Sequence, residues 1–334
     1  MLFILAGRPR HVLTHWGLVL VAVTAAAGCS AFPEDSPAHT RPGLSVVRIA
    51  HTWGDEGSPF ASTFRRALTQ TMPGTEIVVL SSAVGATNLL MLHRDDMDAV
   101  STYADIAYMA SIGQLPEIEE AFDGIRAIAA LPVRTLQIVV GPHSAIRSMS
   151  DFRGRRVSLG PPGTGIAITA GLLLSAFGIE RGDLHVEQLA FDEAVSRLMN
   201  GEIDAAFWGG AIPSAGIQTL AARGARILQV LGPEIERVRA EYPFLRATII
   251  PSGTYVGIDE PIHTVGVDRI FVCRADLDED VVYHLTEAFL KAVVAGAAGD
   301  GSVLRGFNLS RAAATPLALH PGAARYYREI EMRR

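Results

Sequence analysis

Short apolar runs and amphipathic stretches alternate along residues 46–298, in the rhythm of strands that are each followed by a helix. Such alternation predicts parallel sheets covered by helices on both faces. Pro73 and Gly74 mark one of the helix ends. The predicted strands are 46–51, 76–81, 97–101, 125–131, 136–141, 156–159, 186–190, 205–208, 226–230 and 264–273, and the predicted helices are 60–72, 87–93, 104–113, 166–177, 191–200, 215–223, 232–242 and 279–298.

Neither half of this series has enough strands for a large sheet of its own. We therefore expect an α/β fold of two similar lobes, joined by crossing strands and separated by a cleft. A short helix followed by an Asp-Ala strand occurs once in each half, with Asp98 and Asp204 at matching positions. We interpret these two residues as turn formers, because Asp side chains hydrogen-bond the backbone of turns.

The N-terminus has the pattern of an export signal. Arg8 and Arg10 precede the uncharged run 16–28, which ends in small residues directly before Cys29. The run is shorter than the roughly 20 residues of a membrane-spanning helix. We interpret residues 1–28 as a lipoprotein signal peptide and Cys29 as the lipidated first residue of the mature chain, although Ala26 stands where such signals usually have Leu. An ordinary cleaved signal or a short uncleaved anchor is the alternative.

Composition indicates an acidic protein with a tether after the signal. The Pro-, Ser-, Asp- and Glu-containing stretch 29–44 predicts a flexible tether. The chain has 334 residues, 49% of them hydrophobic, and a net charge of −6. Removal of residues 1–28 deletes two Arg and no acid, so 27 basic residues then face 35 acidic ones and the charge becomes −8. No basic stripe is present, which argues against nucleic-acid binding, and Cys273 lies in an apolar run typical of a buried, inert thiol.

A glycine-rich elbow, Gly-Pro-Pro-Gly-Thr-Gly at 160–165, lies between a predicted strand and a predicted helix. It is similar to an ATPase phosphate loop, but Ile166 and Ala167 stand where that motif needs Lys and Ser or Thr. The backbone N–H groups and the helix N-terminus that remain can still attract a small anion. The elbow therefore favours binding of a small anion, such as a carboxylate, over nucleotide hydrolysis.

Candidate ligand contacts follow from the rule that open α/β sheets bind ligands beyond the carboxyl ends of their strands. Short hydroxyls, glycines, an amide and two Trp occupy these positions, which suits hydrogen bonds and apolar walls around a small polar ligand. Asn88 and Asp105 could instead only cap helices, and either Trp could be an ordinary core residue. The candidates are Thr52, Trp53, Ser82, Asn88, Tyr103, Asp105, Gly163, Thr164, Gly165, Trp208 and Gly209.

Motifs of catalysis and metal binding are missing from the sequence. It contains no HExxH, GxSxG, CxxC or SxxK, and its ten His residues are scattered. We expect no enzymatic activity, no metal and no cofactor. A hydrolase with two carboxylates stays an alternative, because such pairs meet only in the folded chain.

Seven segments, taken together and in this order, resemble the TAXI family of solute receptors, the extracytoplasmic binding subunits of tripartite ATP-independent periplasmic (TRAP) transporters. The resemblance covers about residues 45–330. The segments are 82–113, 131–179, 204–222, Glu-Tyr-Pro-Phe-Leu at 241–245, Gly-Thr-Tyr at 253–255, Cys-Arg-Ala-Asp-Leu at 273–277 and His-Pro-Gly-Ala-Ala-Arg-Tyr-Tyr at 320–327.

The resemblance implies a two-lobed, type II periplasmic-binding-protein-like fold that closes on its ligand. Lobe 1 would be 44–138, completed by 254–334, and lobe 2 would be 139–253. The implied partners are a small carboxylate, such as glutamate or a 2-oxo acid, and the subunits of a sodium-coupled TRAP permease. We expect a monomer, lipid-anchored on the outer face of the cytoplasmic membrane.

Some residues of this chain match the family's motifs, and others differ from them. The matches are Asn88, Asp105, Gly163, Thr164, Gly165 and Tyr255, all implied ligand contacts. Gly85 and Ile166 replace hydroxyl residues common in the family, and 51–53 replaces glycine-rich sequence with bulkier residues. These departures make the cleft more apolar, so we hypothesise an anionic ligand with an apolar part.

Two other functions stay open from the sequence. The chain could be a binding lipoprotein of another importer class or a sensor co-receptor. It could also be an exported enzyme on the same fold.

Overall fold

The computed structural model describes residues 46–52, 59–82, 84–118, 120–210, 212–296 and 307–332. The predicted signal peptide (1–28), Cys29, the tether (29–44) and Trp53 lie outside the described residues. Among the helices of the described residues, none is long and apolar enough to cross a membrane.

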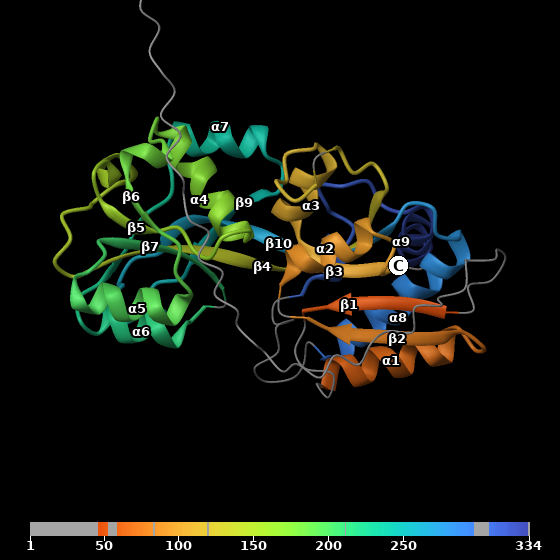
Figure 1. Ribbon diagram of the computed structural model, residues 1–334. Coiled ribbons are helices and arrows are strands. Elements are labelled where there is room, and N and C mark those ends of the chain that lie inside the picture. The colour runs from red at the N-terminus through yellow and green to blue at the C-terminus, as the bar shows by residue number, and fades with distance from the viewer. Residues whose placement is uncertain are drawn as a thin grey trace, which may run out of the picture. The chain divides into compact units, whose positions relative to one another are not determined.

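Ten strands of the described chain form one mixed sheet, in the order β2-β1-β3-β10-β4-β7-β5-β6, with β9 paired to β10 and β8 to β4 (Figure 1). Strands β1, β2 and β3 run parallel in one lobe, and β5, β6 and β7 run parallel in the other. The strands are β1 (Val46–His51), β2 (Glu76–Ser81), β3 (Ala99–Tyr103), β4 (Ile125–Val140), β5 (Arg156–Ser158), β6 (His185–Glu187), β7 (Ala205–Gly210), β8 (Arg226–Ile227), β9 (Leu245–Ile250) and β10 (Ile262–Arg274).

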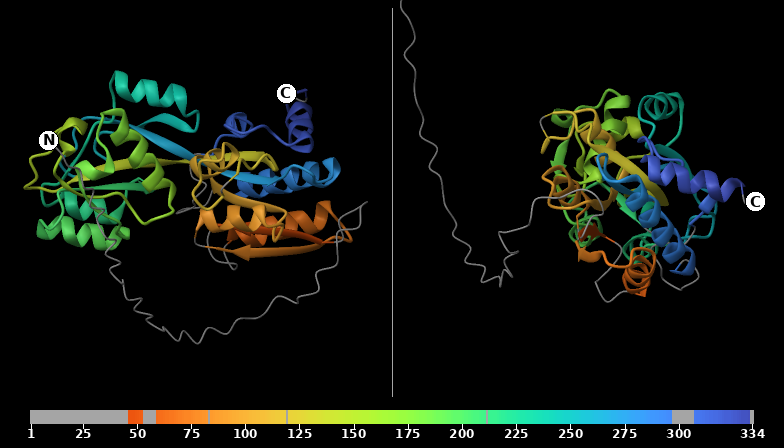
Figure 2. Two further views of the ribbon diagram at one scale, coloured as in Figure 1. Left: turned by 45° about the horizontal axis from the view of Figure 1, so that its top comes forward. Right: turned by 90° about the vertical axis from the view of Figure 1, so that its right-hand side faces the viewer.

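The long strands β4 and β10 join the two lobes, as Figures 1 and 2 show. They run antiparallel to each other; β10 pairs with β3 in lobe 1, and β4 pairs with β7 in lobe 2. The predicted α/β fold with two lobes joined by crossing strands is therefore confirmed, while the expectation of purely parallel sheets is wrong. The predicted lobe limits, 44–138 with 254–334 and 139–253, stay a prediction.

Helices cover both faces of the sheet in each lobe. In lobe 1, α2 and α3 pack over one face and α1, α8 and α9 over the other. In lobe 2, α4 packs against α7, and α5 against α6 on the other face (Figure 1). The helices are α1 (Pro59–Thr71), α2 (Gly85–His93), α3 (Ala104–Ser111), α4 (Gly165–Ala176), α5 (Phe191–Asn200), α6 (Ala215–Ala221), α7 (Pro233–Glu241), α8 (Glu279–Gly296) and α9 (Pro321–Met332).

One apolar core continues from lobe 1 into lobe 2. It contains Val100 of β3 and Ala107 of α3 together with Leu173 of α4 and Phe207 of β7, all of them buried. On the opposite face of lobe 1, Phe64 of α1 packs against other aromatic rings of β10 and α8 in a separate core. The α2–α3 side of lobe 1 is thus the side on which the two lobes meet.

The same Arg–Asp contact occurs once in each lobe. Asp98 accepts hydrogen bonds from the main chain and the guanidinium of Arg48, and Asp204 accepts the same set from Arg156. Asp98 precedes β3, which pairs with β1, the strand of Arg48, and Asp204 precedes β7, which pairs with β5, the strand of Arg156. Each acid therefore holds two neighbouring strands together and does not only form a turn. The interpretation of Asp98 and Asp204 as simple turn formers was therefore incomplete.

Several predicted elements differ from the observed ones. The predicted strands 125–131 and 136–141 are one 16-residue strand, β4. Pro132, which lacks an N–H group, is accommodated within this strand where the register between β4 and β10 shifts. Only two residues of the predicted strand 226–230 form a strand, β8. Neither β9 nor α9 was predicted.

Gly322, in the first turn of α9, allows a close approach of α9 to α8. A Cβ atom at this position would lie 2.2 Å from the carbonyl oxygen of Glu279 and 2.8 Å from the N atom of Tyr283. Gly322→Ala should therefore lower the free energy of unfolding by about 1–3 kcal/mol through overpacking, measured by urea denaturation.

The matched control for this variant is Gly171→Ala in α4. Nothing lies within 4 Å of a Cβ atom built at Gly171. Since Ala is the better helix former by about 1 kcal/mol, this variant should be as stable as the parent or more stable. Equal stability changes in the two variants would contradict the close packing of α8 and α9.

Candidate functional site

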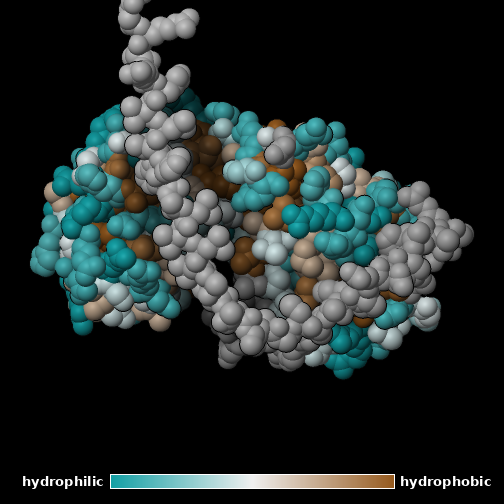
Figure 3. Space-filling view, in the orientation of Figure 1, coloured by the Kyte–Doolittle hydropathy of each residue, from teal (hydrophilic) through white to brown (hydrophobic). Residues whose placement is uncertain are grey.

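A cavity of about 250 Å³ lies between the two lobes. Apolar surface shows in the hollow between the lobes in Figure 3, framed by polar surface. The lining comes from the start of α2, from β3 and α3 in lobe 1, from β4, and from the elbow, α5 and β7 in lobe 2. It comprises Val84, Gly85, Tyr103, Ile106, Arg134, Ser158, Gly160, Pro161, Gly163, Thr164, Gly165, Ile166, Leu189, Phe191, Ala194, Phe207, Trp208 and Gly209.

The predicted elbow forms one wall of this cavity. Gly160 and Gly163 have left-handed backbone angles, with φ of 85° and 68°, which glycine adopts without steric cost. Thr164 is the N-cap of α4: its hydroxyl donates to the carbonyl of Pro161 at 2.7 Å and accepts from the N–H of Ala167 at 3.4 Å. The elbow therefore presents a helix N-terminus to the cavity, and the Thr164 hydroxyl serves the elbow itself.

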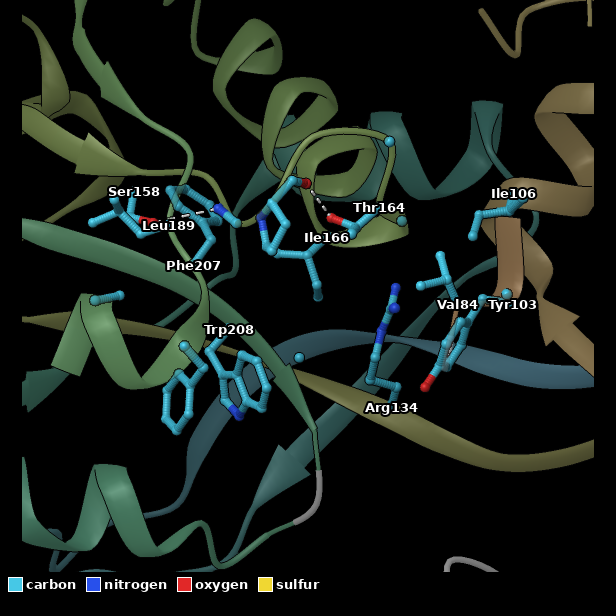
Figure 4. Close-up of a pocket in the computed structure, with 18 residues that line it drawn as sticks. Val84, Tyr103, Ile106, Arg134, Ser158, Thr164, Ile166, Leu189, Phe207 and Trp208 are labelled. Atoms are coloured by element: carbon cyan, nitrogen blue, oxygen red, sulfur yellow. Dashed lines mark hydrogen bonds between the residues drawn. The ribbon is translucent and has the colours of Figure 1, made fainter. Parts of the chain in front are cut away.

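Arg134 projects from β4 into the cavity between the elbow and Tyr103 (Figure 4). Its side chain is 9% exposed, and its guanidinium lies 4.0 Å from the centre of the Tyr103 ring. A Cβ atom on Gly209 would lie 2.1 Å from Cδ1 of Ile166 and 2.9 Å from Nε of Arg134, so glycine at 209 lets both side chains pack against β7. The predictions from sequence missed Arg134, which lies in the middle of a strand and not at its end.

Asp105, predicted as a ligand contact, is fully buried and holds Arg134. Its Oδ2 atom accepts from Nη2 of Arg134 at 2.8 Å and from the hydroxyl of Thr169 at 3.3 Å, and its Oδ1 atom accepts from the N–H of Ile106 at 2.9 Å. A Cβ atom on Gly165 would lie 2.2 Å from Oδ2, so Gly165 packs directly against the carboxylate. Asp105 thus links α3 of lobe 1 to α4 of lobe 2.

A second arginine, Arg269 of β10, lies at the hydroxyl end of Tyr103. Its Nη2 atom donates to the Tyr103 hydroxyl at 3.0 Å, and its guanidinium is 5.3 Å from the ring centre. Burial alone would raise the pKa of the Tyr103 hydroxyl, but the charges of Arg269 and Arg134 and the hydrogen bond from Arg269 together lower it. The sequence had no signal for Arg269, which is one of many charged residues in the chain.

Thr52, Ser82 and Asn88, three further predicted contacts, meet at the carboxyl ends of β1, β2 and β3. The Asn88 amide donates to the carbonyl of Ser101 at 2.9 Å and accepts from the Ser82 hydroxyl, and the N–H of Thr52 donates to the Ser101 hydroxyl at 2.9 Å. Asn88 is fully buried and does not cap α2, whose N-cap is Val84. These residues do not line the cavity, and their ligand contacts stay a prediction.

Trp208 and Gly209, both predicted, line the cavity on β7. The Trp208 ring stacks on Phe191, with centroids 3.8 Å apart and an interplanar angle of 20°. Its buried Nε1 atom has no hydrogen-bond partner among the described residues. The Nε1 atom lies beside Gly210 of β7, where a Cβ atom would be 2.8 Å from it.

Tyr255, the last predicted contact, lies away from the cavity lining. It is 2% exposed; its hydroxyl donates to Oε1 of Gln137 at 2.6 Å and accepts from the N–H of Ser214 at 2.9 Å. In this structure the hydroxyl ties the loop before α6 to β4. A direct contact of Tyr255 with ligand stays a prediction.

The described residues contain no group of three or more His, Cys, Asp or Glu residues that could hold a metal ion. Cys273 is fully buried, which raises its pKa well above its ordinary value. The cavity lining combines Arg134, Tyr103, a helix N-terminus and apolar walls, which is suited to binding. Asp105 and Arg269 do not line the cavity but hydrogen-bond to Arg134 and Tyr103.

Solved structures similar to this chain are distant. The alkanesulfonate-binding protein SsuA from Xanthomonas axonopodis pv. citri, bound to MOPS, is 17% identical, with coverage of 76% of this chain and 74% of that chain and a TM-score of 0.44. PhnD1 from Prochlorococcus marinus, in complex with methylphosphonate, is 12% identical, with coverage of 75% and 84% and a TM-score of 0.46. XAC2383 from Xanthomonas citri, bound to a chloride ion, is 16% identical, with coverage of 86% and 96% and a TM-score of 0.49.

A family assignment comes from a match at the level of sequence. The model of the NMT1-like family matches residues 62–330, which is well over half of the chain and includes the elbow, Arg134 and Trp208. The chain therefore belongs to the NMT1-like family.

Proposed function

We propose that this protein is an extracytoplasmic solute-binding receptor that captures a small organic anion in the cleft and delivers it to a TRAP-type permease. The observation that carries the proposal is the buried Arg134 in the cavity wall, beside the N-terminus of α4. Both groups favour negative charge, and both face a cavity of a size suited to a small molecule.

The charge balance around Tyr103 favours a ligand with a single negative charge. Arg134 and Arg269 are the two cations close to its ring, and Asp105 is the one acid whose charge acts on it. Asp105 pairs with Arg134, whereas Arg269 forms no ion pair with a described residue. Its Nε atom is buried and lacks a hydrogen-bond partner among those residues. Arg269 is half-buried and lies behind Tyr103 rather than in the cavity lining, so two cations stand against one acid beside the cavity. One added anion would balance this charge.

The remaining walls favour a ligand with an apolar part. Ile166, Leu189 and Phe207 line the cavity, together with the stacked rings of Phe191 and Trp208. These residues support the hypothesis, drawn from the departures at Gly85 and Ile166, that the ligand combines a carboxylate with an apolar group.

Ligand capture would involve movement of the lobes about β4 and β10. Asp105 already joins the lobes by accepting from Thr169 of α4. A ligand that contacts Arg134, the elbow and Trp208 would add contacts between the lobes. It would favour the closed arrangement because it would bind the closed state more tightly than the open state.

The proposals of a TRAP permease, a lipid anchor and an extracytoplasmic location rest on the family resemblance and on the N-terminal signal. The protein would be exported, lipidated at Cys29, monomeric and held at the outer face of the cytoplasmic membrane. A binding lipoprotein of another importer or sensor system is the alternative: a neighbouring gene for a multi-spanning permease supports TRAP delivery, and one for an ATPase supports the alternative. No enzymatic activity is proposed, so ligand should be recovered unchanged after incubation.

A thermal-shift screen of the full chain against organic and amino acids tests the function. Monocarboxylates with an apolar side chain should raise the melting temperature, since a ligand at 100 times its Kd adds about 2.7 kcal/mol of stability. Stabilisation by glutamate or 2-oxoglutarate alone would contradict the apolar part of the ligand. No stabilisation by any acid would contradict the anion receptor itself.

Thr164→Ala tests the role of the elbow. Loss of the N-cap should cost about 1 kcal/mol of folding stability and should weaken binding of the best acid from the screen several-fold, because the N–H groups of α4 lose their fixed position. Thr164→Ser, which keeps the hydroxyl, is the matched control and should bind like the parent. Unchanged affinity of the Ala variant in isothermal titration calorimetry would remove the elbow from the site.

A further inference from the structure

A second hollow, here called the rear groove, is lined by three arginines and one buried acid. Its cavity encloses about 550 Å³. Arg239 comes from α7, Arg246 from β9, Asp268 from β10, and Arg311 from the short 3-10 helix Leu309–Arg311. A smaller cavity of about 80 Å³ shares Arg246, Asp268 and Arg311 and extends the groove along β4.

The rear groove is separate from the cleft. The two cavities have no lining residue in common. Asp268 of β10 pairs with Val133 of β4, and Val267 pairs with Arg134. Paired residues share a face of the sheet and neighbouring residues alternate, so Asp268 lies on the face opposite Arg134. In the same way Val133, which lines the smaller cavity, lies opposite Arg134 of the cleft. The rear groove therefore occupies the other side of the two strands that join the lobes.

The arginines of the rear groove are incompletely paired. Arg246 forms an ion pair with Asp268, whose side chain is 8% exposed. A terminal nitrogen of Arg239 pairs with the exposed Glu236, but its Nε atom is buried and has no partner among the described residues. Arg311 forms no ion pair within the described part of the chain. Three cations thus face two acids, one of which is largely in solvent.

Asp268 alone does not neutralise the rear groove. Burial raises the pKa of its carboxyl, and the charges of Arg246 and Arg311 offset this only in part. Guanidinium groups bind oxyanions with two parallel hydrogen bonds, and Arg311 and the Nε edge of Arg239 have donors to spare. The chemistry of the groove fits an oxyanion with several acceptor oxygens.

We propose that the rear groove is a second binding site, for a small multivalent oxyanion such as phosphate or a polycarboxylate. The site joins α7 and β9 to the C-terminal segment 311–316, across the strands about which the lobes would move. Occupancy would therefore bias lobe movement from the side opposite the solute. This site is independent of the solute proposed for the cleft.

Phosphate and citrate are the probes for the rear groove, added to the full chain and followed by thermal shift and calorimetry. Both should stabilise the parent protein, and Arg311→Gln should weaken their binding at least tenfold. Because Arg311 has no ion-pair partner among the described residues, its loss leaves no acid unpaired and should not impair folding. Arg239→Gln serves as a second variant and should weaken binding in the same direction.

Arg328→Gln is the matched control, because Arg328 is exposed on α9 and its loss changes the net charge by the same amount. It should bind both probes like the parent. A double variant of the cleft, Arg134→Met with Asp105→Asn, should also retain probe binding. Equal weakening by Arg311→Gln and Arg328→Gln, probe binding lost in the cleft variant, or no stabilisation of the parent would overturn the proposal.

Discussion

The ion pair between Arg134 and Asp105 is the constraint on which the cleft depends. A buried guanidinium needs a partner, and removal of one member of a buried pair typically costs about 3–5 kcal/mol. Asp105 reaches Arg134 from α3 while accepting from Thr169 of α4, so one carboxylate joins both lobes. Gly165 packs directly against the Asp105 carboxylate, and Gly209 packs against the side chains of Ile166 and Arg134, so a Cβ atom at either position would force a shift.

The resulting cleft has a charge pattern suited to one anion. The guanidinium groups of Arg134 and Arg269 both lie over the ring of Tyr103. Asp105 is the one acid, and it both pairs with Arg134 and accepts from Thr169 in the other lobe. The glycine-rich elbow serves this cleft rather than a nucleotide site. Its last glycine accommodates the Asp105 carboxylate, and its helix N-terminus adds to the positive side of the cavity. Nucleotide binding, which the missing lysine already argued against, has no counterpart in this arrangement.

Much of the fold was predictable from local patterns, whereas partner choice between distant strands was not. The alternation of strands and helices indicated two α/β lobes. It could not indicate that β10 pairs antiparallel with β3, because this pairing joins residues far apart in the sequence, such as Tyr103 and Arg269, which are 166 residues apart. In the cleft, the elbow, Trp208 and Gly209 were found by the strand-end rule. Arg134 and Arg269 were missed because they lie within the crossing strands, where that rule does not look.

The central claim is that the negative charge of the ligand is bound in the cleft beside Arg134. Calorimetry with an apolar monocarboxylate and its neutral amide tests it most directly, in the parent and in the double variant Arg134→Met with Asp105→Asn, which leaves neither partner unpaired. The account predicts that the parent binds the acid at least about tenfold more tightly than the amide, a difference of about 1.4 kcal/mol, and that the double variant loses this preference. Equal affinity of the parent for acid and amide, or an unchanged preference in the variant, would contradict it.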